Sequence, residues 1–223
     1  MDRFQRFNNR AGVAVASLAA AAALVITDAT SAFFKSRLIG GAAAVVLVSI
    51  LALVGSTLLE SAVDRSRRIR RWIAQDDFVE GWWLDVAKDP ASGLSTHAAL
   101  QQVSYREGAF VVSGSSYLRG GERLASWSSE ACAYVHRTLF VVYEAQTAEV
   151  GGLYERGLVE MKFDTPPTSY SGSYRDFSGQ VIRSLRGERI SDRELLEHNG
   201  LQTVADRISL LRSRVPEFRS APE

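Results

Sequence analysis

The chain has 223 residues, of which 46% are hydrophobic and 23% charged, and its formal net charge is +1. This length suits one or two domains, and the near-neutral charge and mean hydropathy of -0.04 average an apolar first quarter with a polar remainder. A single cysteine, Cys132, excludes an intrachain disulfide and a cysteine-based metal centre, so we expect a reducing compartment and a buried, inert thiol.

Two segments near the N-terminus, residues 11–27 and 38–59, contain no charged residue. A membrane-spanning helix needs roughly 20 apolar residues, with about 17 as the lower limit. We therefore predict a two-helix transmembrane anchor over residues 1–62, of which the alanine-rich first span is marginal. A cleaved signal peptide is the alternative for the first segment, because arginines precede its alanines. The short connection, residues 28–37, favours a retained helical hairpin.

The positive charges beside these spans predict their orientation. Arg3, Arg6 and Arg10 precede the first span and five arginines lie between residues 65 and 71, whereas the connection holds only Lys35 and Arg37. Cytoplasmic flanks carry the positive excess, so we expect a multi-pass protein of the inner membrane with both termini in the cytoplasm. Residues 63–77 are predicted to be a basic linker on anionic headgroups, with Trp72 at the interface. Its position after a span favours that interpretation over binding of DNA or RNA.

From residue 78 to residue 190 the sequence turns to short runs of β-branched and aromatic residues separated by Gly, Ser, Asp and Pro. Leu139, Val141 and Tyr143 alternate with their neighbours, which indicates strands with one buried face. We predict eight strands, over residues 79–87, 98–106, 109–118, 122–131, 138–146, 153–164, 169–177 and 180–186. The predicted fold class is mainly β: a small antiparallel up-and-down β-barrel of about eight strands that follows the transmembrane α-hairpin. A sandwich is the alternative.

Residues 191–216 are predicted to form C-terminal helices. Ser191 and Glu194 have the spacing of a capping box. The residues Leu201, Val204, Ile208 and Leu211 recur at helical spacing, which predicts an apolar stripe that ends before Pro216.

The sequence contains no recognisable catalytic or metal-binding motif. His97, His136 and His198 are scattered over an expected strand, a loop and a helix end, and no nucleophile elbow, phosphate loop or dinucleotide fingerprint is present. We therefore expect no enzyme activity, no metal and no cofactor.

Aromatic and arginine residues on the strands are instead candidates for ligand contact. Aromatic rings stack on bases and guanidinium groups bind phosphate oxygens in pairs. The same rings can also simply fill a barrel core. The candidate ligand-binding residues are Tyr105, Arg123, Trp127, Tyr154, Tyr170, Tyr174 and Arg175.

Two N-terminal spans, a basic juncture and the motifs VEGWWLDV, LASWSSEA and SGSYRDFSG together resemble the two-transmembrane β-barrel effectors of CBASS, the bacterial cyclic-oligonucleotide antiphage system. The residues that fit the family's strand motifs are Gly81, Trp82, Trp127, Gly172, Tyr174 and Asp176. The resemblance implies that the barrel binds a cyclic dinucleotide made by a neighbouring nucleotidyltransferase. It also implies that ligand-driven homo-oligomerisation lets the helices disrupt the membrane, which ends in abortive infection.

The sequence thus predicts a cytoplasm-facing sensor of a cyclic dinucleotide that contacts membrane lipids and copies of itself. A membrane-anchored, lipocalin-like barrel that binds an apolar small molecule is the alternative, and an interior lined only by Val, Leu and Phe would favour it.

Overall fold

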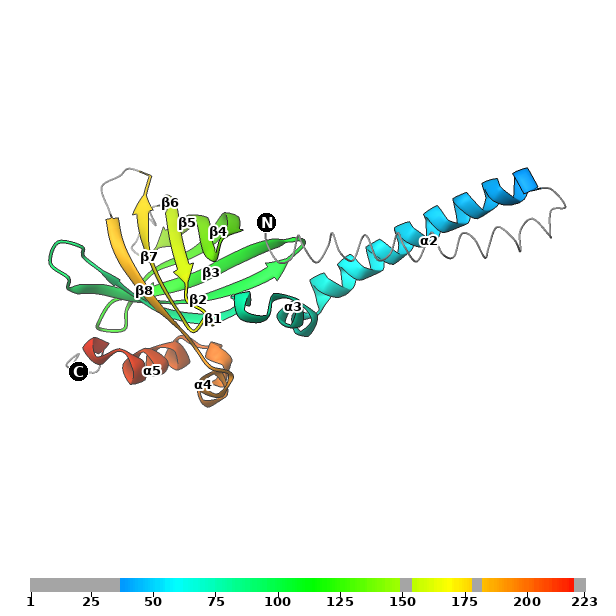
Figure 1. Cartoon of the computed structure of the whole chain (residues 1–223). Helices are drawn as coiled ribbons and strands as arrows, with labels where there is room; N and C mark the ends of the chain where they lie inside the picture. Colours follow the sequence, from blue (N-terminus) through cyan, green and yellow to red (C-terminus); the bar gives the residue numbers. More distant parts are fainter. Residues whose placement is uncertain (1–36, 149–153, 178–181, 219–223) are drawn as a thin grey trace. The chain divides into compact units, whose positions relative to one another are not determined.

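The computed structural model describes residues 37–148, 154–177 and 182–218 (Figure 1). The chain divides into two compact units at Gln75 and Asp76. The predicted span over residues 11–27 lies outside the described residues.

The first unit contains one long apolar helix, α2 (Arg37–Arg65), which includes the predicted span over residues 38–59. Its segment Val45–Arg65 is long and apolar enough to cross a membrane, with a mean hydropathy of 2.0 and no buried residue in the apolar window. Among the described residues, one helix is long and apolar enough to do so, and this is that helix. The expectation of a helix that could span a membrane is therefore confirmed for this segment.

A short basic helix, α3 (Arg67–Ala74), follows α2 after a break at Ser66. The Ser66 side chain caps α3 by accepting a hydrogen bond from the Ile69 amide. The buried Arg70 donates from Nη1 to the carbonyl oxygens of Val63, at 2.8 Å, and Asp64, at 2.6 Å. Because the last carbonyls of a helix lack partners within it, this guanidinium stabilises the C-terminal end of α2. The exposed residues of α3 include Trp72, of which 71% is accessible.

Eight antiparallel strands form a closed barrel in sequence order, with β8 paired to β1. This arrangement confirms the predicted barrel and excludes the sandwich. Closure leaves none of these eight strands with an open edge. The strands are β1 (Gly81–Lys88), β2 (Ser95–Arg106), β3 (Ala109–Tyr117), β4 (Arg123–Val135), β5 (Thr138–Thr147), β6 (Tyr154–Phe163), β7 (Ser169–Asp176) and β8 (Ile182–Arg189).

Two of the hairpins have the same two-residue turn although their sequences differ. Glu107 and Gly108 both have positive φ, at 52° and 79°, as expected of the turn that matches the strand twist. His136 and Arg137 adopt the same left-handed region, at 48° and 66°, without a glycine. A search of the sequence for glycine-containing turns therefore finds the first hairpin and misses the second.

Side chains alternate between the barrel interior and its surface. Leu139, Val141 and Tyr143 of β5 are buried in the interior as predicted. In β4 the pairing register shifts between Ser129 and Ala131, so the strand holds one extra residue at this point. The shift places Cys132 and Tyr134 beside the interior core. Cys132 is half-buried rather than fully buried as expected, and burial raises the pKa of its thiol.

The C-terminal helices pack on the outer surface of the barrel (Figure 1). They are α4 (Asp192–Glu197), η2 (Asn199–Leu201), α5 (Val204–Arg214) and η3 (Pro216–Phe218). Leu84 and Leu100 of β1 and β2 form a second core with Leu201, Leu210 and Leu211. This outer core anchors the helices to the first strands of the barrel.

The predicted apolar stripe of α5 is wrong in one position. Val204 is 49% exposed, whereas Leu210 and Leu211 are buried. Thr203 caps α5 through a capping box with Asp206, so Val204 is the first residue of the helix and lies on its solvent side. Leu201 precedes the cap, and its side chain reaches the core from η2.

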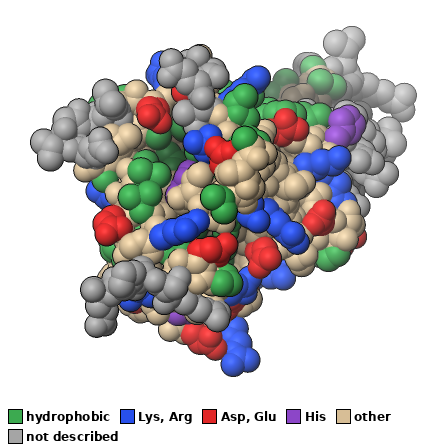
Figure 2. Space-filling model, turned by 90° about the vertical axis from the view of Figure 1, so that its left-hand side faces the viewer, with side chains coloured by type: hydrophobic (Ala, Val, Ile, Leu, Met, Phe, Trp, Pro, Cys, Tyr) green, Lys and Arg blue, Asp and Glu red, His purple; other side chains and the backbone are tan. Residues whose placement is uncertain are grey.

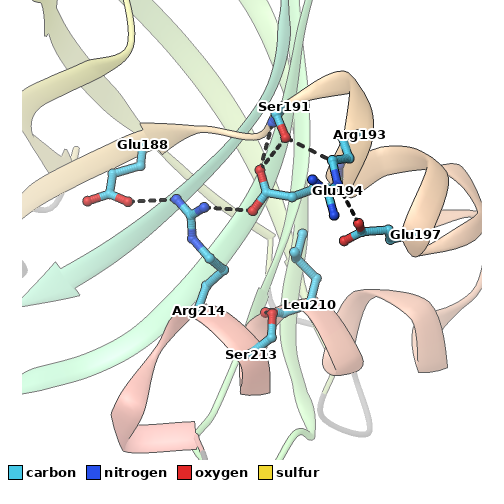
Figure 3. Close-up of polar contacts among 8 residues, drawn as sticks. All are labelled: Glu188, Ser191, Arg193, Glu194, Glu197, Leu210, Ser213 and Arg214. Carbon is cyan, nitrogen blue, oxygen red and sulfur yellow. Dashed lines mark hydrogen bonds and ion pairs between the residues drawn. The ribbon is translucent and has the colours of Figure 1, made fainter.

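An ion-pair network holds α4, α5 and β8 together (Figure 3). The Arg214 guanidinium contacts Glu194 of α4 at 2.6 Å and Glu188 of β8 at 2.7 Å. Ser191 and Glu194 form the predicted capping box, which is confirmed. Glu194 therefore serves both the N-terminus of α4 and the contact with α5.

Candidate ligand-binding site

One end of the barrel interior is filled by aromatic rings. Trp83, Phe163 and Tyr170 contact one another edge to face, with ring centroids 5.0–5.6 Å apart. The indole Nε1 of Trp83 donates to the Val79 carbonyl at 2.9 Å, so its polar atom is satisfied. Arg189 lies over the Trp83 ring at 5.5 Å. We call this ring-filled part of the interior the packed end.

The other part of the interior encloses a cavity of about 230 Å³. Thr147 at the end of β5 and Glu155 at the start of β6 line it, so it lies toward the end of the barrel where β5 and β6 are joined. We call this the cavity end. Its polar and aromatic lining residues include Asp85, His97, Gln101, Trp127, Tyr143 and Tyr174.

Figure 2 shows the surface that faces left in Figure 1, where the β1–β2 loop, residues 89–94, also lies. Acidic and basic described side chains are interleaved over this face rather than gathered in a patch of one sign. The charged side chains seen on this face are therefore of mixed sign.

Large rings fit inside so narrow a barrel because glycines face them on adjacent strands. A Cβ atom added to any of these glycines would overlap the facing ring. The ring thus occupies space that a side chain on the next strand would otherwise take. The facing pairs are Trp127 with Gly114, Tyr143 with Gly157, and Tyr170 with Gly187.

A buried polar network lies at the boundary between the two ends. The Tyr170 hydroxyl donates to Asp85 Oδ2 at 2.6 Å, and Gln101 Nε2 donates to the same oxygen at 3.1 Å. Gln101 Nε2 also makes a short contact with the Tyr170 hydroxyl. Burial raises the pKa of Asp85 to about 7, against a smaller lowering by the Tyr170 hydrogen bond. Burial thus shifts this carboxyl toward its protonated form relative to an exposed aspartate.

A histidine in the cavity wall is held neutral. Burial, and to a smaller extent the nearby positive charge of Arg183, lower the pKa of His97 to about 4. The His97 ring lies 5.9 Å from the Tyr174 ring, which faces it across the interior. Arg183 itself pairs with Asp89 at 3.6 Å. Burial likewise raises the pKa of Tyr174 to about 12, so its hydroxyl stays protonated and can donate.

The structure brings only some of the seven candidate residues together. Trp127 and Tyr174 line the cavity. Tyr170 is buried and takes part in the polar network, and Tyr105 contacts Phe110 edge to face, with ring centroids 5.2 Å apart. The remaining three, Arg123, Tyr154 and Arg175, are exposed, with side chains outside the cavity lining.

Sequence reasoning missed Asp85, His97, Gln101 and Tyr143 as cavity residues, and it missed Arg183 beside the cavity. The available signal was strand alternation. Asp85 shares a face with the buried Trp83, and Arg183 shares one with the buried Leu185. Selecting aromatics and arginines by residue type alone discarded that signal.

The cavity lining mixes polar and apolar side chains. Val159 and Leu185 contribute apolar surface, whereas Asp85, His97 and Gln101 contribute hydrogen-bonding groups. An interior lined only by aliphatic and phenylalanine side chains was the condition that would favour an apolar ligand, and the described lining does not meet it.

No known family model and no curated protein sequence matches the chain.

Proposed function

We propose that this chain is a membrane-anchored receptor whose barrel binds a cyclic dinucleotide. In its ligand-bound form it self-associates, and its apolar helices then disrupt the bacterial inner membrane, as the resemblance to two-transmembrane CBASS effectors implies. The observation that carries the proposal is the cavity with Trp127 and Tyr174 in its wall. Both residues belong to the strand motifs that carry the resemblance, and aromatic faces are what nucleobases stack on.

The size of the cavity fits part of such a ligand. A protein cavity of about 150 Å³ holds benzene, and drug-sized ligands occupy about 300–1,000 Å³. A cavity of about 230 Å³ therefore has room for one bicyclic base. The second base, the sugars and the phosphates would lie at the mouth, where Arg183 is a basic residue on the inward face of β8.

The membrane part of the proposal rests on α2 and on the arginines that follow it. The segment Val45–Arg65 is apolar enough to span, and α3 exposes Arg67, Arg68 and Trp72 directly afterwards. Basic residues next to a span favour the cytoplasmic side and attract anionic lipids. The barrel is accordingly cytoplasmic, where a nucleotide messenger is made.

The proposed mechanism needs no chemistry by the protein. A ligand that binds the assembled form more tightly than the monomer shifts the population toward assembly by that difference in affinity. Moving an equilibrium from 1:99 to 99:1 takes about a 10⁴-fold difference. A ligand that contacts two subunits from the mouth of a barrel is one physical source of such a difference.

The proposal is tested with the purified full chain in detergent micelles. Cyclic dinucleotides of different bases are titrated by calorimetry, and the mass of the protein is followed by light scattering. We expect at least one of them to bind and to increase the mass. Absence of binding across the set, or binding with no change in mass, rejects the proposal. Binding of a fluorescent fatty acid instead would favour the lipocalin-like alternative.

Two substitutions localise the site. Trp127→Ala and Tyr174→Ala remove stacking surfaces, and each should weaken binding about ten- to a hundredfold, because stacking contributes about 1–3 kcal/mol per base. Phe140→Ala is the matched control, since this aromatic residue of β5 is exposed on the outer surface and should bind as the unaltered chain does.

A further inference from the structure

Residues 78–80 are an irregular segment that is buried just before β1 begins. Each of them is 4% exposed or less, and none belongs to a helix or strand. A buried backbone outside regular structure must find its hydrogen-bond partners elsewhere. Arg189 donates to the carbonyl of Phe78, at 2.8 Å, and to that of Glu80, while the carbonyl of the middle residue accepts from Trp83 Nε1 at 2.9 Å. We call residues 78–80 the junction, because the chain runs from them through α3 to α2.

A single guanidinium makes most of these contacts. Arg189 lies at the end of β8, 5.5 Å from the ring centroid of Phe78 and 5.5 Å from that of Trp83. Its Nη1 also donates to the Pro167 carbonyl at 3.4 Å, in the connection between β6 and β7. A planar guanidinium has five N–H donors in a fixed arrangement, so one side chain can hold several carbonyls in defined positions. Arg189 therefore fastens the junction both to β8 and to the β6–β7 connection.

The junction is linked to the cavity through one residue. Trp83, which holds the middle carbonyl of the junction, contacts the Tyr170 ring with 5.6 Å between centroids. The Tyr170 hydroxyl donates to Asp85 at 2.6 Å, and Asp85 lines the cavity. Close-packed side chains have little space to absorb a displacement, so a change at Asp85 is passed on to its neighbours. An unbroken series of contacts thus joins the cavity wall to the junction.

We infer that the junction couples the cavity to α2: an occupant of the cavity weakens the hold of Trp83 and Arg189 on residues 78–80 by way of Tyr170. An occupant that packs against Asp85 competes with the Tyr170 hydroxyl for the carboxyl, and loss of that hydrogen bond lets the Tyr170 ring move against Trp83. Such coupling needs a ligand whose affinities for the held and the released junction differ. The inference rests on the proposed function for its ligand and adds the route by which binding reaches the membrane segment.

Hydrogen exchange of the full chain in detergent micelles tests this coupling. Exchange of the junction amides is measured by mass spectrometry with and without the cyclic dinucleotide that binds most tightly, and peptides from β5 serve as the internal reference. We expect the ligand to speed exchange at the junction about tenfold, a typical size for coupling between two sites, and to leave β5 unchanged. Unchanged or slower exchange at the junction of the ligand-bound chain overturns the inference and leaves the proposed function standing.

Thermodynamic linkage provides a second test, which a merely structural role would not pass. If the ligand favours the released junction, a substitution that releases the junction must raise the affinity for the ligand. Arg189→Gln removes the guanidinium that holds two of the three carbonyls, and we expect it to bind the dinucleotide up to about tenfold more tightly in calorimetry. Arg186→Gln, at an exposed position of the same strand, is the control that should not change the affinity. Equal or weaker binding by Arg189→Gln rejects the coupling.

Tyr170→Phe tests the route without any ligand. The substitution keeps the ring that contacts Trp83 and removes the hydroxyl that donates to Asp85. We expect the junction amides of this variant to exchange about fivefold faster than those of the unaltered chain, with β5 unchanged. Equal exchange at the junction in the two chains rejects the route through Tyr170.

This comparison also separates the inference from the proposed function. If no cyclic dinucleotide binds, the proposed function is rejected, and the exchange of Tyr170→Phe still decides whether the cavity wall and the junction are linked. If a dinucleotide binds and increases the mass while the junction does not respond, the proposed function stands and the inference is rejected.

Discussion

The same eight strands build two very different halves of one barrel interior. At the packed end Trp83, Phe163 and Tyr170 fill the space with rings in mutual contact. At the cavity end Trp127 and Tyr174 have the same residue types but border empty volume. The comparison shows that an inward aromatic residue contributes to stability when it meets other rings and becomes available for binding when it does not.

The largest expected effect separates these two kinds of aromatic residue. Trp83→Ala should lower the free energy of unfolding by about 3–5 kcal/mol, since it removes a fully buried indole and leaves a void among the remaining rings. Trp127→Ala should cost clearly less, because its ring is only partly buried and already borders a cavity. Urea unfolding of the full chain, followed by circular dichroism, measures both. Equal losses would show that the two ends do not differ in this way.

A smaller effect is expected from filling rather than emptying the packed end. Gly187→Ala would place a methyl group against the Tyr170 ring, which Trp83 and Phe163 hold in place. Overpacking of this kind costs about 1–3 kcal/mol. Thermal unfolding of the variant beside the unaltered chain is the measurement. An unchanged midpoint would mean that the packed end can rearrange as easily as the cavity end.

The pH dependence of stability probes the polar boundary between the ends. Asp85 has a pKa of about 7 in the folded chain against 3.8 in the unfolded chain. Between these pH values the folded chain holds the proton more tightly, so the contribution of Asp85 to folding stability falls as pH rises from about 4 to about 7. Native His97 has a pKa of about 4 against 6.5, so the unfolded chain binds the extra proton and stability falls as pH drops over nearly the same range. The two contributions oppose each other.

Two single variants should therefore change the slope of folding stability against pH in opposite directions. Asp85→Asn leaves the His97 contribution, so its stability relative to the unaltered chain should rise between about pH 5 and about pH 6.5. His97→Gln leaves the Asp85 contribution, so the stability of this variant relative to the unaltered chain should fall over that interval. Each slope is limited to about 1.4 kcal/mol per pH unit. Denaturant midpoints at the two pH values give the differences, and parallel profiles for all three chains would contradict the assignment.

The smallest expected effect concerns the mouth of the cavity. Arg183→Gln removes a positive charge that lowers the pKa of His97, so the His97 pKa should rise while the fold is kept. Arg186→Gln, on the same strand with an exposed outward side chain, should leave the His97 pKa where it is. Titration of the histidine ring by NMR distinguishes the two variants. A rise in both would show that His97 senses overall charge rather than its neighbour on the inward face.

The strands of the barrel were predictable because they have a strong local signal. Alternation such as that of Leu139, Val141 and Tyr143 depends only on neighbours along the chain. The cavity was less predictable, because it is formed by residues from all parts of the barrel. Trp127 and Tyr174 could be selected by residue type, but so could Tyr154 and Arg175, which the structure leaves outside.

By itself, the sequence determined the apolar N-terminal helix, the eight strands and the capped C-terminal helix at Ser191, since each follows from composition or spacing within a short segment. Only the tertiary structure decided that the sheet closes, that β8 pairs with β1, and that Asp85 meets Gln101 and Tyr170 inside. The physical reason is the pairing register. It places residues from distant strands opposite one another, and it depends on the sum of all strand contacts rather than on any one of them.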